Sequence, residues 1–346
     1  MLTYYFDTPD PDDRAPAPTT GPVPAVLVTG AAGYVAGPVV ARLVAAGHQV
    51  VGLDNLSTSS GRTLPPGVHL VRAQVGDRVV LRRIFSDWRI AAVFHFAGDT
   101  SVGESMTEPL RYYQHNVRES LALLEAVLAS GGAPFIFSSS AAVYGIPARS
   151  PIPEDAVLAP INPYGETKAV FERALHWAGV AHDLPWAALR YFNAAGSEGA
   201  WERKAVETHL IPRVLAAAAG GPPLAVYGQD YPTPDGTAVR DYVHVADLAA
   251  GHLAALAHLR RGGESGCFNL GSGRGCSVAE VIGAAERVTG RPVPWAPGPR
   301  RDGDPPALVA DVSRAAAVLD WRANRSSLGE IVADAWRAWQ AGGGPA

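Results

Sequence analysis

Two side chains that could move protons, Tyr164 and Lys168, stand four residues apart in a segment suited to starting a helix. Asn162 can cap that helix, and Pro163 suits its first turn, where a missing N–H group costs nothing. Residues four apart on a helix share a face, with Cβ atoms roughly 5–6 Å apart. An ammonium that close favours the phenolate, so we expect the pKa of Tyr164 to be lowered. The pair predicts a base for an alcohol proton, although this spacing also occurs by chance on many surface helices.

A glycine-rich turn upstream supplies the context that the pair needs. Residues 25–29 form a short apolar run, typical of a strand buried on both faces, and Gly30, Gly33 and Ala36 follow it. Such glycines let backbone approach a pyrophosphate at the amino end of a helix. Asp54 ends the next apolar run, at the distance expected for an acid that binds a ribose. The acid, in place of a nearby arginine, favours NAD over NADP.

Apolar runs and helical segments then alternate along the chain. We expect further strands over residues 49–53, 68–72, 92–96, 134–138 and 186–190, and helices over 39–46, 78–88, 110–129 and 164–181. Repeated β-α units predict an α/β protein with a Rossmann-type, doubly wound parallel sheet. Ligands of such sheets bind at the carboxyl ends of the strands. After residue 193 the pattern loosens, which predicts a smaller C-terminal α+β lobe over the cleft.

The composition excludes several classes of protein. The 346 residues are 47% hydrophobic, enough for one large core, and a formal net charge of −4 gives no basic stripe for nucleic acid. No apolar run approaches the roughly 20 residues that cross a membrane. Cys267 and Cys276 are too few for a disulfide scaffold or a thiolate metal site, so we expect no metal. The proline-rich leader lacks the features of a secretory signal, and a cytoplasmic location is expected.

The Tyr-x-x-x-Lys motif, after a nucleotide turn and a strand that ends in serine, resembles the extended short-chain dehydrogenase/reductase superfamily. Within it, the chain from about residue 26 to 339 is similar to the family of UDP-glucose 4-epimerases. The matching motifs are Val28–Tyr34, His95–Gly98, Val102–Ser105, Ser138–Gly145, Asn162–Gly165, Arg190–Asn193, Gly228–Thr237, Arg240–Leu248 and Arg300–Asp304. The Tyr-Pro-Thr-x-Asp-Gly-Thr segment is far more specific than the nucleotide turn.

The resemblance implies a role for each matching residue. Tyr164 would be the acid/base, Lys168 would tune it and hold the nicotinamide ribose, and Ser140 would bind the reacting sugar oxygen. NAD would be bound by Gly30, Gly33, Tyr34, Val35, Asp54, Asn55, Leu56, Gln74, Val75, Phe96, Ala97, Gly98, Thr100, Asn116, Ser138, Tyr164, Lys168 and Phe192. The UDP-sugar would be bound by Ser140, Tyr164, Asn193, His209, Leu210, Tyr227, Arg240, Arg301, Asp304 and Leu308. The family also implies a homodimer built from a bundle of two helices per subunit.

The same resemblance divides the chain by role. Residues 1–24 are expected to be a disordered leader and 341–346 a flexible tail. Residues 25–192 would form the NAD-binding Rossmann domain, with a segment near 243–270 returning to it. Residues 193–242 and 271–340 would form the lobe that binds the nucleotide sugar.

Some positions depart from the family pattern. Gln74 and Val75 stand where an acid usually lies beside the adenine, so we expect different adenine contacts. Thr100 replaces a lysine near the cofactor phosphates, which predicts weaker retention of NAD. Ala142 replaces a threonine near the sugar. Leu308 falls where members restricted to glucose and galactose carry a bulky tyrosine.

The implied reaction interconverts UDP-glucose and UDP-galactose through a transient 4-keto sugar, with a hydride lent to bound NAD and returned. Leu308 leaves room for an N-acetyl group, so UDP-GlcNAc and UDP-GalNAc are a second substrate pair to consider, as is a UDP-pentose. A nucleotide-sugar 4,6-dehydratase would carry Asp-Glu where this chain has Ala141-Ala142. A plain NAD-dependent dehydrogenase would release its cofactor in each cycle. A sugar-nucleotide-binding regulator on the same fold is disfavoured, because the catalytic residues are intact.

Overall fold

The structure is a computed structural model that describes residues 24–58, 64–198, 209–300 and 304–342. The expected leader, apart from Pro24, and the last four residues of the expected tail lie outside the described residues. Arg301 lies outside them too.

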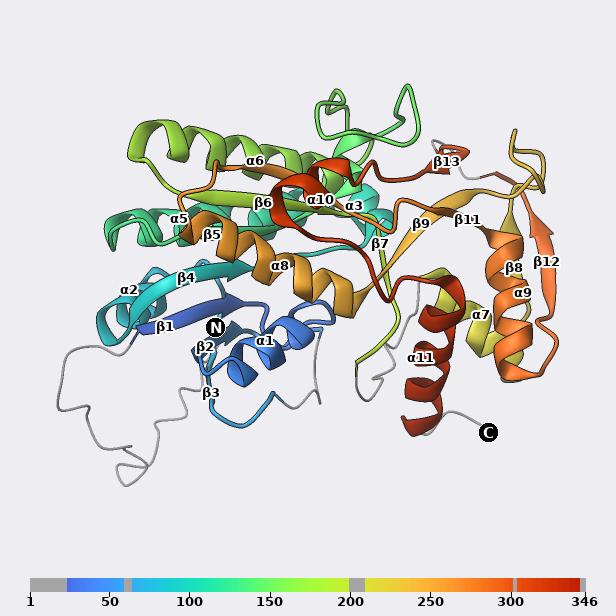
Figure 1. Ribbon diagram of the computed structural model, residues 1–346, viewed down its shortest axis with the longest axis horizontal. Helices are drawn as coiled ribbons and strands as arrows, with labels where there is room; N and C mark the ends of the chain where they lie inside the picture. The colour runs from blue at the N-terminus through green and yellow to red at the C-terminus, as the bar shows by residue number, and fades with distance from the viewer. Residues whose placement is uncertain (1–23, 59–63, 199–208, 301–303, 343–346) are drawn as a thin grey trace.

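Seven parallel strands form the central sheet, in the order β10-β6-β5-β4-β1-β2-β3 (Figure 1). They are β1 (Pro24–Thr29), β2 (Gln49–Asp54), β3 (Val68–Arg72), β4 (Arg89–His95), β5 (Phe135–Ser140), β6 (Trp186–Tyr191) and β10 (Gly266–Leu270). The chain runs outward from β1 in both directions, which makes the sheet doubly wound with a switch point beside β1. The predicted Rossmann-type fold class is confirmed.

Apolar side chains on both faces of the sheet explain why helices cover both faces. In β1, Ala25 and Leu27 belong to one core, and Val26 and Val28 belong to the other. The first core packs under α2 (Arg78–Asp87), α5 (Glu119–Ala129) and α6 (Pro163–His182). The second packs under α1 (Ala36–Ala45), α8 (Val245–Arg260) and α10 (Ser313–Leu319). Figure 1 shows α5 and α6 on one side of the sheet and α1 and α8 on the other.

Two helices differ from the expected boundaries by more than one residue at an end or in continuity. The helix expected from residue 39 begins at Ala36, so Pro38 lies in its first turn, where proline is tolerated. The helix expected over 110–129 is divided into α4 (Pro109–Tyr112), a π-helical segment η1 (Tyr113–Arg118) and α5. A π-helical turn is frequently found at functional sites, and this one contains Asn116.

The part of the chain after residue 192 builds a second core beside the sheet. It includes α7 (Leu210–Ala218), α9 (Val278–Thr289) and α11 (Leu328–Ala341), with β8 (Leu224–Tyr227) paired to β12 (Trp295–Gly298). A further sheet joins β7 (Asn193–Ala195), β9 (Val239–His244), β11 (Gly275–Ser277) and β13 (Ala307–Leu308). Between these elements α8 and β10 return to the central sheet, and β10 pairs with β6. Figure 1 shows α7, α9 and α11 gathered at one end of the molecule.

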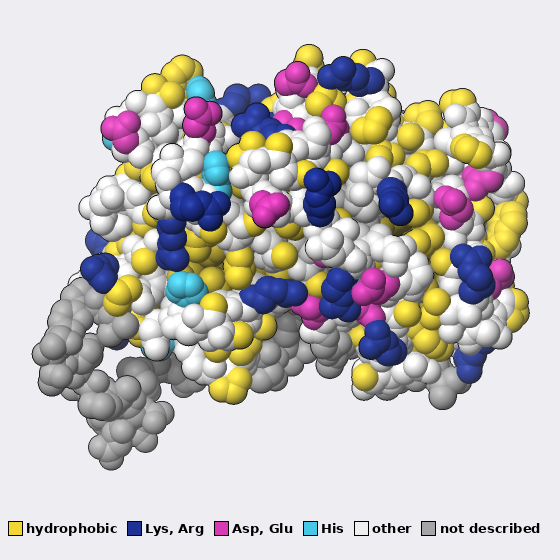
Figure 2. Space-filling view, in the orientation of Figure 1, with side chains coloured by type: hydrophobic (Ala, Val, Ile, Leu, Met, Phe, Trp, Pro, Cys, Tyr) yellow, Lys and Arg dark blue, Asp and Glu magenta, His cyan; other side chains and the backbone are white. Residues whose placement is uncertain are grey.

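The described surface carries both signs of charge. Figure 2 shows basic and acidic side chains interspersed over the face that it draws. Among the described residues, no helix combines the length and apolar character that a membrane span requires.

Candidate active site

The amino end of α6 meets the carboxyl end of β5, and this meeting brings the predicted catalytic residues together. Asn162 caps α6 by accepting a hydrogen bond from the N–H of Gly165 at 2.8 Å, and Pro163 opens the helix. Ser140 is the last residue of β5, and its side chain is hydrogen-bonded to Tyr164. The short 3-10 segment η2 (Ala141–Tyr144) then carries the chain away from the site.

Lys168 lies one helical turn behind Tyr164 and is buried, with 3% of the residue exposed. Its Nζ donates to the carbonyl oxygen of Ser138 at 2.9 Å and stands 4.8 Å from the ring centroid of Phe137. Burial lowers the pKa of Lys168 to about 8, and the Glu172 carboxylate acts in the opposite direction. The ammonium therefore loses its proton much more readily than an exposed lysine.

The pKa of Tyr164 differs from the sequence expectation. Nζ of Lys168 lies 5.9 Å from the centre of the Tyr164 ring. Burial raises the pKa of Tyr164, and the hydrogen bond with Ser140 only partly opposes this shift. The expectation that the lysine lowers this pKa is wrong. Spacing on a helix revealed the neighbouring charge but not the loss of water around the phenol.

Asn116 and Gly98 close the space beside Lys168. The side chain of Asn116 accepts from the N–H of Asp99 at 2.8 Å and donates to the Thr167 hydroxyl at 3.1 Å. Gly98 has φ +150, and a Cβ there would lie 2.7 Å from Oδ1 of Asn116 and 3.8 Å from Nζ of Lys168. Only glycine fits this position, so the loop after β4 runs directly against η1 and α6.

The glycine-rich turn has the shape that a dinucleotide pyrophosphate requires. Gly30 has φ +66, and a Cβ there would lie 2.7 Å from the backbone nitrogen of Ala97. The amino end of α1, at Val35, has no side-chain cap, and the N–H of Gly37 donates to the carbonyl oxygen of Gly33 at 3.0 Å. The positive end of the helix dipole there favours an anion. Asp54 is buried and accepts from the N–H groups of Ala32 at 3.0 Å and Leu56 at 2.7 Å. These residues fit the pyrophosphate and ribose of NAD.

The other predicted cofactor residues follow the same edge of the sheet. Gly33, Tyr34 and Val35 follow β1, Phe96 and Ala97 follow β4, and Phe192 follows β6. Ser138 lies within β5, two residues before its end. Asn55 and Leu56 follow β2, and Leu56 has a left-handed backbone with φ 60. Gln74 follows β3 and accepts from the side chain of Asn55 at 3.0 Å, whereas Val75 is buried in the core and Thr100 is exposed.

Four of the predicted substrate residues gather around β9. Asn193 donates to the carbonyl oxygen of Asp241 at 3.1 Å. Leu308 in β13 pairs with Arg240 in β9. Arg240 is hydrogen-bonded to the Asp304 carboxylate and donates to the carbonyl oxygens of Val239 and Pro305. These three bonds leave two of the five guanidinium N–H donors without a partner among the described residues.

Leu308 connects this group to the catalytic group. It packs against a cluster that contains Ala141, Val143 and Phe192. Ala141 directly follows Ser140 in the sequence. The remaining predicted substrate residues lie farther into the second lobe, where His209 and Leu210 begin α7 and Tyr227 ends β8. Arg301 is the one predicted site residue that falls outside the described part of the chain.

Sequence reasoning missed a group of buried polar residues directly behind the site. His95 is hydrogen-bonded to Thr29 Oγ1 at 2.6 Å and to Ser120 Oγ at 2.7 Å, and burial lowers its pKa to about 3. Glu172 is bound by Arg190. The available signal for Glu172 was its position four residues after Lys168, on the same helix face.

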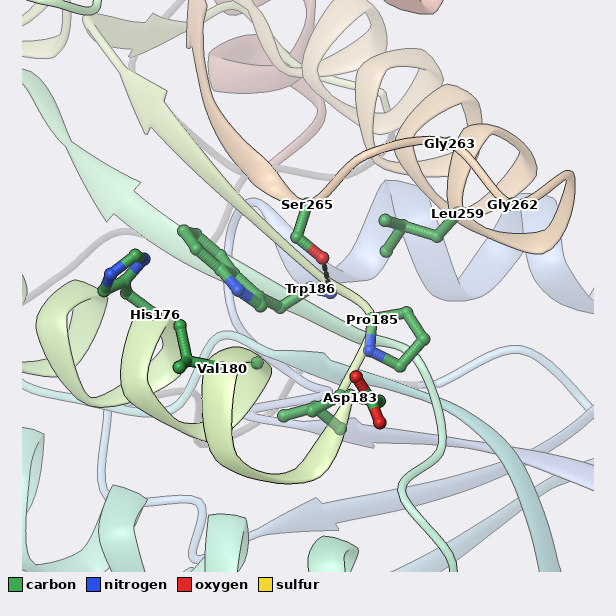
Figure 3. Close-up of a pocket in the computed structure, with 11 residues that line it drawn as sticks. His176, Val180, Asp183, Pro185, Trp186, Leu259, Gly262, Gly263 and Ser265 are labelled. Atoms are coloured by element: carbon green, nitrogen blue, oxygen red, sulfur yellow. Dashed lines mark hydrogen bonds between the residues drawn. The ribbon is translucent and has the colours of Figure 1, made fainter.

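A cavity of about 420 Å³ lies at the opposite end of the sheet (Figure 3). It opens between the carboxyl ends of α6 and α8 and the start of β6, among residues that include Val180, Asp183 and Trp186. Tyr164 and Asp183 are separated by the length of α6, roughly 28 Å at the rise of an α-helix. Because ligands of doubly wound sheets bind at the carboxyl ends of the strands, this cavity is not the active site.

The family model of the NAD dependent epimerase/dehydratase family matches residues 26–271, more than half of the chain. This chain belongs to that family. A member from Azospirillum brasilense, a UDP-glucose 4-epimerase, is 47% identical over 320 residues, which cover 91% of this chain and 92% of that protein. The match confirms the resemblance seen in the sequence motifs.

Solved structures of other UDP-glucose 4-epimerases have the same fold. The enzyme from Brucella ovis in complex with NAD has a TM-score of 0.88 and 42% identity, covering 92% of this chain and 99% of that one. The enzyme from Bifidobacterium longum in complex with NAD+ and UDP has a TM-score of 0.85 and 37% identity, with coverage of 92% and 99%. The likeness therefore extends over both the sheet and the second lobe.

Proposed function

We propose that this chain is an isomerase that interconverts UDP-glucose and UDP-galactose by inverting C4 of the sugar, with NAD as a retained cofactor. The observation that carries the proposal is the contact of Ser140, Tyr164 and Lys168 at the carboxyl end of β5. These three residues lie at the same edge of the sheet as the glycine-rich turn at Gly30, which fits NAD. The relatives that match this chain over nine-tenths of its length include UDP-glucose 4-epimerases, of which one is solved with NAD and another with NAD+ and UDP.

The cofactor would be held by Gly30 and the amino end of α1 at its pyrophosphate, by Asp54 at a ribose, and by Lys168 at the nicotinamide ribose. When bound, NAD supplies a hydride acceptor for C4 of the sugar and a positive charge near the phenol. The buried, charged Lys168 adds a second positive charge on the same side. Together these two charges would offset the burial that raises the pKa of Tyr164.

The side chains of this chain handle the proton. Tyr164, as phenolate, takes the proton from O4 of the sugar and later returns it to the same oxygen. Ser140 hydrogen-bonds to the tyrosine and would hold the reacting oxygen in reach. Because the proton goes out and comes back through one phenol, the residue ends each cycle in the state in which it began.

Inversion requires that the substrate be held by its nucleotide and not by its sugar. The two N–H donors of Arg240 that lack a partner among the described residues suit a pyrophosphate oxygen. Asn193 and Asp304 each bond to a residue of β9. Held there, a 4-keto sugar could turn to present its other face to the cofactor.

A second substrate pair is favoured by Leu308. This side chain is half-buried against the cluster beside Ser140, where a larger residue would reach toward the sugar. A leucine leaves room for a 2-N-acetyl group, which supports turnover of UDP-GlcNAc and UDP-GalNAc by the same chemistry. A 4,6-dehydratase is disfavoured because Ala141 and Ala142, which follow β5, have no proton to give or take.

The proposal also assigns parts of the chain and an assembly. Residues 25–192, with the return near 243–270, would bind NAD, because α8 and β10 join the central sheet. Residues 193–242 and 271–340 would bind the nucleotide sugar. A homodimer through η1–α5 and α6 is supported by apolar side chains exposed on or beside these helices. They are Leu110, Tyr113, Leu121, Trp177 and Val180.

Two measurements on purified protein test the proposed reaction. Denaturing the protein should release NAD, which mass spectrometry identifies. In assays on a panel of UDP-sugars, the protein should interconvert UDP-glucose and UDP-galactose. With deuterium at C4 of the substrate, the label should stay in the product. Release of the label into water, or a net accumulation of oxidised sugar, would contradict the proposal.

A further inference from the structure

A buried ion pair lies directly behind the catalytic lysine. Glu172 is one helical turn after Lys168 on α6, and its side chain is 4% exposed. Arg190 of β6 grips its two carboxylate oxygens, with Nε donating at 3.0 Å and Nη2 at 2.7 Å. The hydroxyl of Ser139 donates to the same carboxylate at 2.5 Å. Both carboxylate oxygens are therefore bound by side chains of β5 and β6.

The strand pattern shows why these groups meet. Phe135, Phe137 and Ser139 lie on the face of β5 that α6 covers, so a polar residue replaces an apolar one at the carboxyl end. Ser139 is paired with Arg190 in β6, and Arg190 is paired with Asn269 in β10. Three neighbouring strands thus turn polar at the same level, which is the level of the active site.

Arg190 is also held on its far side. Its Nη1 donates to the Tyr144 hydroxyl and to the carbonyl oxygen of Glu154, both at 2.9 Å. The Tyr144 hydroxyl in turn donates to Asn269 at 2.7 Å. The guanidinium cannot move toward Lys168 or away from Glu172 without breaking these bonds.

Three consecutive serines of β5 meet three consecutive turns of α6. The carbonyl oxygen of Ser138 binds Lys168, the hydroxyl of Ser139 binds Glu172, and the hydroxyl of Ser140 binds Tyr164. A slide of α6 along the strand would break all three contacts at once. The Glu172 contact is the one that lies outside the reacting centre.

Stability alone does not explain this arrangement. Replacing a buried ion pair by apolar residues of similar size is often neutral or stabilising. Here the pair stands beside an ammonium that burial makes easy to deprotonate, and Glu172 raises the pKa of Lys168 against that tendency. The Glu172 carboxylate is thus placed where its charge favours the protonated form of Lys168.

The other titratable groups around Lys168 do not supply that negative charge. His95 of β4 is buried, and its lowered pKa keeps it neutral. Tyr191 of β6 has a raised pKa and bonds to His252, so it is a neutral phenol. Cys267 of β10 lies 3.7 Å from the Glu172 carboxylate, and burial raises its pKa to about 12. The Glu154 carboxylate accepts from the N–H of Asn269 on the far side of Arg190.

We propose that Glu172 is a positioning residue for the Tyr164–Lys168 pair. Held by Arg190 and Ser139, it keeps α6 in register with β5 and maintains a negative charge one turn behind the lysine ammonium. This inference rests on the proposed function, because it assigns Tyr164 and Lys168 to the reaction.

The experiment compares Glu172→Gln with Glu166→Gln in the full chain. Glu166 lies on the same helix, and its carboxylate accepts from Arg173 at the surface at 3.0 Å, so it controls for loss of a helical glutamate. Turnover of UDP-galactose is measured from about pH 6 to 9.5 with proteins that carry equal amounts of NAD. The basic limb of kcat in Glu172→Gln should move to lower pH by about one unit, the effect of removing an opposite charge nearby. At about pH 8.5 that is a loss of about tenfold, against less than about twofold at about pH 6, with KM unchanged.

The outcomes separate the inference from the proposed function. Glu166→Gln should match the native pH profile, and Glu172→Asp, which keeps the charge, should restore the native limb. If Glu172→Gln folds and the basic limb of its kcat profile does not move, the positioning role is overturned. If the native protein fails to interconvert the sugars, the proposed function itself is overturned.

If Glu172→Gln does not fold, the variant Ser139→Ala provides the test. It removes only a hydroxyl, and we expect kcat to fall about threefold to tenfold at a temperature where the variant is fully folded. Unchanged kcat there overturns the inference.

Discussion

Nζ of Lys168 lies 5.9 Å from the ring centroid of Tyr164 and donates its hydrogen bond to the Ser138 carbonyl oxygen, not to the phenol. The lysine therefore makes no hydrogen bond to the tyrosine. Ser140 is the side chain that bonds to the phenol directly. This separation gives the two neighbours of Tyr164 distinct and separately testable roles.

Replacing Tyr164 by phenylalanine should remove the proton carrier and leave the protein folded. We expect kcat to fall by about 10² or more, because no other acid or base replaces the phenol. NAD content, measured after denaturation, should stay near the native value. Turnover within about threefold of native would contradict the assignment of Tyr164 as the base.

The charge on Lys168 should set the basic limb of activity. With its pKa lowered by burial to about 8, the lysine is charged at lower pH and loses its proton as the pH rises through that value. Turnover should therefore decline as the pH rises above this value. Lys168→Met should lose about 10² in kcat, retain less NAD, and lack this limb. A limb at the same pH in the methionine variant would assign the titration to another group.

Gly98 should be required for the cofactor site and not for the helix that follows it. In Gly98→Ala the new Cβ would collide with Asn116 at an unfavourable φ, at a cost on the order of 1–3 kcal/mol. We expect loss of bound NAD and a lower unfolding temperature. Gly103→Ala, in α3 (Val102–Thr107), meets no atom within 4 Å and is the control that should retain NAD. Equal NAD content in both variants would contradict a role of Gly98 in the cofactor site.

His95 should make the fold sensitive to acid. Its pKa is about 3 in the folded protein against an ordinary 6.5, so between these values only the unfolded chain takes up the proton. This contribution to stability is intact above the ordinary value and is lost by about 1.4 kcal/mol per pH unit as the pH falls. His95→Gln should unfold with a shallower dependence on pH in urea titrations from about pH 7 to 4.5. His69→Gln, at an exposed position on β3, should keep the native slope.

Leu308 should decide which sugars are accepted. The native protein should turn over both UDP-galactose and UDP-GalNAc. In Leu308→Tyr the larger side chain should lower kcat/KM for UDP-GalNAc about tenfold or more and leave UDP-galactose within about twofold. Leu308→Met, of similar volume, is the matched control. The same ratio of the two activities in the native and tyrosine forms would exclude Leu308 as the residue that limits the pocket.

Local patterns predicted a large part of this structure because they record local causes. The alternating side chains of residues 25–29 needed apolar cover on both faces, and the glycine at 30 needed a backbone that other residues avoid. Asn162 and Pro163 began α6 as expected, and the spacing of Tyr164 and Lys168 placed them on one face. The π-helical segment was missed, because the sequence around Asn116 has the ordinary period of an α-helix.

Tertiary structure decided the features that depend on distant partners. Arg190 reaches Glu172 across 18 residues, and Arg240 reaches Asp304 across 64. The direction of the Tyr164 pKa shift was set by burial, which depends on how much water the rest of the fold excludes, and no spacing along one helix reports that. The sequence by itself determined which groups were present and on which strand ends they stood. Packing determined which of them carry charge, because desolvation and ion pairing arise only when segments far apart in the chain come together.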